Sequence, residues 1–164
     1  MIQKYFNKPY VRKMSYAAGF LTKYLLKKPL LTSELRIDVC SICQLKCLSC
    51  PTSHRINKKG VVGWGYMKFE VFKSIVDSNP TVRRIELVNW GEIFLNPQLK
   101  EIIEYDYSKG IKLTANSGVN LNNVKEDVLE SLVKYKFESL KVSLDGATND
   151  SYSFYRKGGN FDQV

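Results

Sequence analysis

Four cysteines lie within eleven residues of this sequence, at Cys40, Cys43, Cys47 and Cys50. Disulfide frameworks spread their cysteines so that bridges close long loops, whereas close clustering is typical of thiolates gathered around a metal in a reducing compartment. Cys43, Cys47 and Cys50 have the spacing C-x3-C-x2-C, which lets a short loop place three thiolates at three corners of an iron–sulfur cube. The fourth iron would then be free to bind a substrate or cofactor.

Cys40 is the cysteine outside this spacing, and it leaves two alternatives open. If Cys40 were a fourth ligand, the site would be a closed iron–sulfur centre that only transfers electrons, or a tetrahedral zinc site. Two-cluster ferredoxins repeat their cysteine runs, and zinc knuckles separate two C-x2-C pairs by many residues. This sequence has one run with a short gap. We therefore favour a structural role for Cys40, since buried free cysteines are common.

Charge is distributed unevenly along the chain of 164 residues, whose net charge is +9. Residues 1–60 carry twelve Lys and Arg against two acids, and the remainder is close to neutral. Residues 1–31 are predicted to form a basic amphipathic helical leader, suited to peripheral contact with acidic lipids or a partner, or to covering one end of the domain, which we favour. The neutral remainder predicts no nucleic-acid partner, and the absence of an apolar signal or membrane segment predicts a cytoplasmic protein.

The elements that must position the cysteines alternate between strands and helices. Strands are predicted over 35–39, 84–89, 111–116 and 138–144. Helices are predicted over 67–77, 97–107 and 123–135, the last capped by Asn123, and another begins at Thr148. This order predicts an α/β fold with a parallel sheet and right-handed crossovers.

Each predicted strand has one apolar and one polar face. Ile111 and Leu113 alternate with Lys112 and Thr114, whereas fully covered parallel strands are usually apolar throughout. An incomplete parallel (β/α) barrel, with helices outside and a wet interior, would produce this pattern. An antiparallel sheet with one solvated face is the alternative, and the intervening helices argue against it.

Three further motifs follow the cysteines in chain order. They are Asn89-Trp90-Gly91-Glu92 with Leu95-Asn96-Pro97, Thr114-Ala115-Asn116-Ser117-Gly118, and Val142-Ser143-Leu144-Asp145-Gly146 with Arg156 and Gly158-Gly159-Asn160-Phe161. Each lies near the end of a predicted strand, where parallel sheets bind their ligands. Together with the cysteine spacing, these motifs resemble the radical S-adenosylmethionine (SAM) superfamily, and in particular its SPASM-type branch, from residue 35 to residue 164.

The resemblance implies a [4Fe–4S] cluster on Cys43, Cys47 and Cys50, and SAM as the second cofactor. Reductive cleavage of SAM to a 5′-deoxyadenosyl radical, which abstracts hydrogen from a substrate, is the implied activity. The residues implied to hold SAM are Gly91 and Glu92 at its amino group, Asn116 at a strand end, and Ser143 and Arg156 near the ribose and carboxylate. Trp90 stands where the family motif has its first glycine, and Ser49 where many members carry an aromatic residue.

The resemblance also implies that the chain is shorter than a whole family barrel. The family generally has six βα units, and about four are predicted here. We therefore expect a leader over residues 1–31 and a radical SAM core over residues 32–164, truncated at its carboxyl end. The implied partners are an electron donor such as flavodoxin or ferredoxin and an unknown substrate, a peptide or a small molecule.

Overall fold

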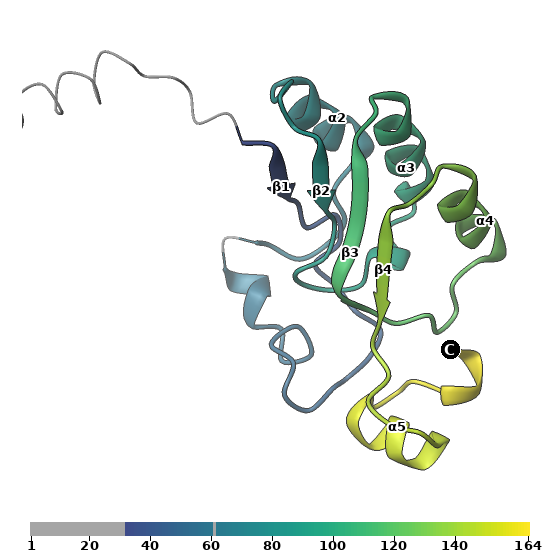
Figure 1. The fold of residues 1–164 in the computed structure, drawn as a ribbon. Coiled ribbons are helices and arrows are strands. Elements are labelled where there is room, and N and C mark those ends of the chain that lie inside the picture. Colours follow the sequence, from purple (N-terminus) through teal and green to yellow (C-terminus); the bar gives the residue numbers. More distant parts are fainter. Residues whose placement is uncertain (1–31, 61) are drawn as a thin grey trace, which may run out of the picture. The chain divides into compact units, whose positions relative to one another are not determined.

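The structure, a computed structural model, describes residues 32–60 and 62–164. Its centre is a four-stranded parallel sheet in the order β1-β2-β3-β4 (Figure 1). The strands are β1 (Glu34–Arg36), β2 (Arg84–Glu86), β3 (Lys112–Val119) and β4 (Ser139–Val142). The predicted α/β fold with four parallel strands, a partial (β/α) barrel, is confirmed.

Helices follow the strands and lie on one side of the sheet (Figure 1). They are α2 (Phe69–Asp77), α3 (Leu99–Ser108) and α4 (Glu126–Lys134), while α5 (Asn149–Tyr155) follows β4 below the sheet. The described residues also form the short 3-10 helices η1 (Ile56–Lys59), η2 (Ile93–Leu95) and η3 (Phe161–Gln163). Within the described ranges, no helix has the length and apolar character needed to cross a membrane. The predicted leader, residues 1–31, lies outside the described residues.

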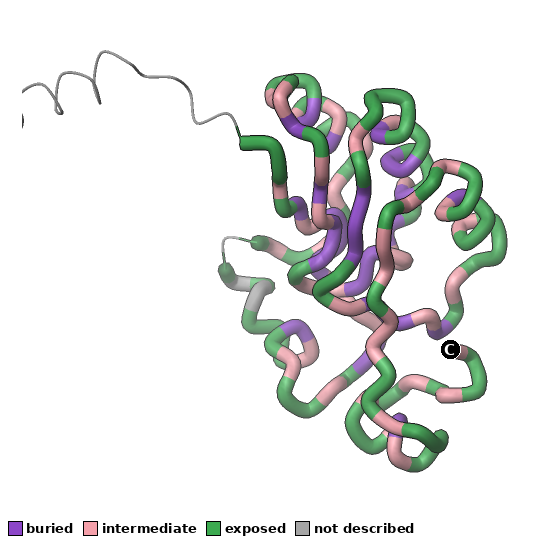
Figure 2. The backbone as a smooth tube through the Cα atoms, in the orientation of Figure 1, coloured by how far each residue is buried: buried purple, intermediate pink, exposed green. Residues whose placement is uncertain are grey.

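The hydrophobic core fills the layer between the sheet and the helices. Ile85 on β2 and Leu113 and Ala115 on β3 turn toward the helices and are buried, and Figure 2 shows this strip along the two central strands. Phe72 of α2 and Ile102 of α3 pack into the same cluster. Because side chains alternate along a strand, burying these residues turns their sequence neighbours to the opposite face.

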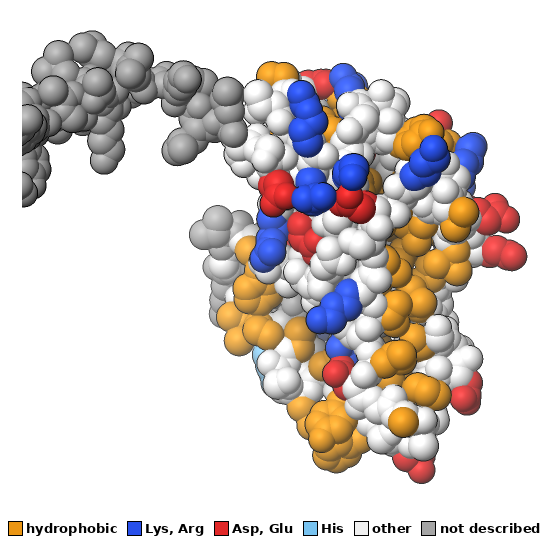
Figure 3. All heavy atoms as spheres, in the orientation of Figure 1, with side chains coloured by type: hydrophobic (Ala, Val, Ile, Leu, Met, Phe, Trp, Pro, Cys, Tyr) orange, Lys and Arg blue, Asp and Glu red, His pale blue; other side chains and the backbone are white. Residues whose placement is uncertain are grey.

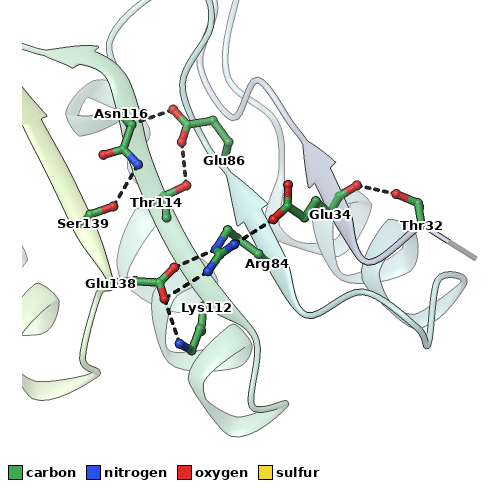
Figure 4. A network of polar contacts seen from close by, with 9 residues as sticks. All are labelled: Thr32, Glu34, Arg84, Glu86, Lys112, Thr114, Asn116, Glu138 and Ser139. Carbon is green, nitrogen blue, oxygen red and sulfur yellow. Dashed lines mark hydrogen bonds and ion pairs between the residues drawn. The ribbon is translucent and has the colours of Figure 1, made fainter.

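The opposite face of the sheet is polar, as the alternating pattern predicts. Arg84 Nε lies 2.7 Å from Glu138 Oε2, and Arg84 Nη1 lies 2.7 Å from Glu34 Oε1. Lys112 Nζ lies 2.8 Å from Glu138 Oε1. Figure 3 shows acidic and basic side chains interspersed over this face, and Figure 4 shows their contacts. Isolated exposed ion pairs contribute little stability, but these four side chains are joined in one network.

Some predicted boundaries were wrong. Strand β2 ends at Glu86, short of its predicted end at residue 89, although the Leu87 amide still donates to the Thr114 carbonyl at 2.9 Å. Strand β3 runs three residues beyond its predicted end, to Val119. Helix α4 begins at Glu126 after Lys125, so Asn123 does not cap it. Asn123 instead has a φ of +62°, a left-handed turn conformation that asparagine adopts more readily than most residues.

Candidate functional site

Cys40 is held in the core at the start of the cysteine loop. It is 1% exposed, and its backbone forms an isolated antiparallel bridge with Tyr66. Its thiol donates to the carbonyl oxygen of Ile42 at 3.4 Å. Burial raises the pKa of this thiol. Cys40 does not belong to the lining of the cavity that the other three cysteines share.

Cys43, Cys47 and Cys50 are half-buried and line one cavity of about 490 Å³. The loop is tight, because the Cys50 amide donates to the Cys47 carbonyl at 3.2 Å. The Cys43 sulfur accepts from the Leu45 amide at 3.4 Å and from Asn120 Nδ2 at 3.9 Å. Among residues 32–60 and 62–164, no three His, Cys, Asp or Glu side chains form a group that could hold a metal ion as they stand.

The cavity is an unfavourable place for uncompensated thiolates. Burial raises the pKa of Cys43 to about 12, against a partial opposing effect of the Leu45 amide. Burial also raises the pKa of Cys47, while the nearby positive charge of Arg156 lowers it. Ionised thiolates here need a positive counter-charge, which Arg156 supplies in part and a bound metal centre would supply in full.

Glu92 lines the same cavity from the loop after β2. Its carboxylate is 2% exposed, and its Oε2 accepts from the Asn120 amide at 2.7 Å and from Asn120 Nδ2 at 2.8 Å. Its Oε1 accepts from the Phe94 amide at 3.3 Å. Burial raises the pKa of Glu92 to about 7, although these hydrogen bonds and the charge of Arg156 oppose the shift.

Gly91 joins this loop to the cysteine loop by close backbone contact. Its φ is +74°, and a Cβ there would lie 2.4 Å from the Cys40 carbonyl oxygen. The neighbouring amides extend the junction, since Trp90 N donates to Asp38 Oδ1 at 2.9 Å and Glu92 N donates to the Ile42 carbonyl at 2.8 Å. Only glycine fits both the backbone conformation and the space.

Ser143 and Arg156 come from the chain that leaves β4. Ser143 N donates to the Val119 carbonyl at 2.9 Å, which holds this residue beside the end of β3. Arg156 ends α5 and forms an ion pair with Asp145. Helix α5 is fixed by a capping box between Thr148 and Ser151, a motif that satisfies the first free amides of a helix.

The buried phenol of Tyr152 anchors α5 against the chain after β3. Tyr152 is fully buried, and its hydroxyl accepts from Asn122 Nδ2 at 2.8 Å. Asn122 Oδ1 in turn accepts from the Asn160 amide at 2.6 Å. These contacts keep the segment that carries Arg156 close to the cavity.

The structure therefore brings together all but one of the residues predicted for the site. Those lining the cavity are Cys43, Cys47, Cys50, Gly91, Glu92, Ser143 and Arg156. Asn116 does not line it and lies on the polar face of the sheet, where its Nδ2 donates to Ser139 Oγ at 2.9 Å. Asn120, which was not predicted for the site, lines the cavity and donates to Glu92. No local signal in the sequence marks Asn120, because its position depends on the register shift between Ala115 and Val119.

Known proteins with a similar fold are larger than this chain. SuiB from Streptococcus suis bound to S-adenosylmethionine has a TM-score of 0.67 and 18% sequence identity, over 93% of this chain and 34% of that chain. BtrN in complex with AdoMet and 2-DOIA has a TM-score of 0.54 and 21% identity, over 67% of this chain and 44% of that chain. SuiB bound to the precursor peptide SuiA has a TM-score of 0.62 and 19% identity, over 96% of this chain and 34% of that chain.

These similarities show a shared fold, and the chain spans about a third of SuiB and under half of BtrN in these complexes. The sequence matches no protein-family model and no curated protein. The comparisons thus establish the fold of the chain, which it shares with SuiB and BtrN.

Proposed function

We propose that this chain is the cofactor-binding part of a radical SAM enzyme, with a [4Fe–4S] cluster on Cys43, Cys47 and Cys50 and SAM beside it. The observation that carries the proposal is one cavity that gathers the three thiols with Glu92 and Arg156. These residues come from three separate segments of the chain. A carboxyl group, a guanidinium and three thiols thus line the same cavity.

The donor set fits such a cluster. Cysteine thiolates are the usual ligands of iron–sulfur clusters, and amide donors to their sulfurs tune them, as the Leu45 amide and Asn120 Nδ2 do for Cys43. The burial of Cys40 away from the cavity supports an open fourth iron over the alternative of a closed four-cysteine site.

A reduced cluster held by the three cysteines would supply the one electron for cleavage of SAM to methionine and a 5′-deoxyadenosyl radical, the species that would abstract hydrogen from a substrate. The chain's own residues would bind and orient SAM. Glu92 has acceptor capacity beyond its contacts with Asn120 and Phe94, so its carboxylate would receive the amino group together with the Gly91 backbone. Arg156 would pair with the carboxylate, and Ser143 would donate to the ribose.

The complexes of similar fold support this assignment of ligands. SuiB and BtrN both have structures with SAM, which is also written AdoMet. Their further ligands differ, a precursor peptide for SuiB and 2-DOIA for BtrN, so a peptide and a small molecule both remain candidate substrates. A cytoplasmic setting with a flavodoxin or ferredoxin as electron donor completes the proposal.

Anaerobic reconstitution with iron and sulfide tests it. Wild-type protein and Cys40→Ala should each bind about four irons per chain, while Cys43→Ala, Cys47→Ala and Cys50→Ala should bind fewer. With dithionite and SAM, the first two should release 5′-deoxyadenosine, detected by chromatography. Zinc in place of iron, or a loss of iron on Cys40→Ala equal to that on Cys43→Ala, would favour the closed site.

A further inference from the structure

A carboxylate on the polar face of the sheet holds the end of β3. Glu86, the last residue of β2, accepts from two successive backbone amides through Oε1, from Asn116 at 2.8 Å and from Ser117 at 3.0 Å. Its Oε2 accepts from Thr114 Oγ1 at 2.5 Å. Figure 4 shows this carboxylate lying between the two strands. One side chain thus receives three hydrogen bonds from β3.

These contacts fall where the ladder between β3 and β4 loses its register. Ala115 pairs with Leu140, and Val119 pairs with Val142. Between these two pairs lie three residues of β3, residues 116–118, but only one residue of β4. We call residues 116–118 the bulge segment. Extra residues of this kind are left out of the regular ladder, and their amides need another acceptor, which Glu86 supplies.

The bulge segment is also a wall of the cofactor cavity. Ser117 and Gly118 line that cavity, and Ser117 also borders a second cavity of about 540 Å³ over the polar sheet face. Gly118 has a φ of +103°, and a Cβ there would lie 2.4 Å from Ser143 Oγ. A small movement of the bulge segment would therefore displace the group proposed to meet the ribose.

We propose that Glu86 is a positioning residue for SAM: its carboxylate fixes the bulge segment so that Ser117, Gly118 and Ser143 form the cavity wall before the cofactor binds. The ligand named here rests on the proposed function. Glu86 does not line the cavity itself, so it acts through the backbone of β3. Preorganisation of this kind strengthens binding, because no binding free energy is then lost in ordering the wall when SAM binds.

Substitutions of Glu86 can separate the effect of its hydrogen bonds from the effect of its negative charge. Both amides meet the same oxygen, so the amide oxygen of Glu86→Gln can accept from them while its NH₂ group donates to Thr114 Oγ1. Glu86→Asp keeps the charge but is one methylene shorter and cannot reach β3 in the same way. Glu138→Ala is the matched control, since Glu138 lies on the same face and contacts Arg84 and Lys112 but not the bulge segment.

The experiment has two readouts on the full chain. Amide hydrogen exchange of Asn116 and Ser117, measured by NMR without cofactor, should be slow in wild type, Glu86→Gln and Glu138→Ala. It should be at least about tenfold faster in Glu86→Asp and Glu86→Ala. The Kd for SAM is measured by equilibrium dialysis on reconstituted protein. It should stay within about threefold of the wild-type value in Glu86→Gln and Glu138→Ala, and rise about tenfold or more in Glu86→Asp and Glu86→Ala.

Unchanged exchange in Glu86→Asp and Glu86→Ala would overturn the proposal, as would faster exchange with an unchanged Kd. Circular dichroism identifies any variant that fails to fold. If Glu86→Ala fails to fold, Glu86→Gln and Glu86→Asp are compared with each other. If wild-type protein with an intact cluster binds no SAM, the proposed function fails, and the role of Glu86 in ordering the wall is judged by exchange alone.

Discussion

Asp106 offers a test of the core that is independent of any cofactor. It lies on the buried face of α3 with Leu99, Ile102 and Ile103 and is fully buried. Within the part of the chain that the structure describes, neither carboxylate oxygen has a hydrogen-bond partner. Burial alone raises the pKa of Asp106 from 3.8 to about 8, because an ionised carboxylate is disfavoured away from water.

The sign of the effect follows from proton linkage. Below about pH 4 both states hold the proton and Asp106 adds no pH dependence. Between about pH 4 and 8 the unfolded state ionises while the folded state stays protonated, so stability falls as the pH rises. At about 1.4 kcal/mol per pH unit, the loss reaches about 4 kcal/mol by pH 7 and levels off near the folded pKa.

Asp106→Asn removes this titration with little change in size. We expect the difference in unfolding free energy, variant minus wild type, to increase by about 3–4 kcal/mol from pH 5 to pH 8. Urea unfolding followed by circular dichroism at several pH values measures it. Glu92 has a raised pKa as well, but it is present in both proteins and its effect cancels in the difference. A difference that is constant across this pH range would refute the reasoning.

Three other substitutions and one matched control have expected outcomes. Gly91→Ala should cost about 3 kcal/mol or more and abolish SAM binding, since its Cβ would overlap a backbone carbonyl of the cysteine loop. The matched Gly110→Ala, with φ +68° and open space around it, should cost about 1 kcal/mol and leave SAM binding intact, and equal thermal shifts would contradict the packing argument. Tyr152→Phe should cost about 1–2 kcal/mol in urea unfolding by leaving the Asn122 amide unpaired; a cost near zero would count against that contact. Arg156→Lys should raise the Kd for SAM about fivefold or more, because lysine lacks the paired donors that suit a carboxylate, and an unchanged Kd would remove Arg156 from the site.

The sequence predicted that most of these residues lie together, and it did so from residue type and spacing. Three thiols at short separations in one loop are expected to lie near one another, and Gly91 and Glu92 follow a predicted strand of a parallel sheet. The carboxyl ends of such strands meet at one edge, so these residues were expected together, and the structure brings them together.

What the sequence did not predict depends on tertiary contacts. The extension of β3 to Val119 relies on a bulge held by Glu86 from another strand, and local propensity carries no record of that partner. The extension is why Asn120, and not Asn116, reaches Glu92. Asn123 resembles a helix cap by residue type, but its left-handed backbone places it in the turn before α4.

The central claim is an iron–sulfur cluster with one iron open to SAM. Electron paramagnetic resonance of the reduced, reconstituted protein, with and without SAM, tests it most directly, with Cys40→Ala beside wild type. The account predicts a [4Fe–4S]⁺ signal in both proteins that shifts when SAM is added. A signal that is indifferent to SAM and persists in Cys43→Ala with Cys40 intact would contradict it.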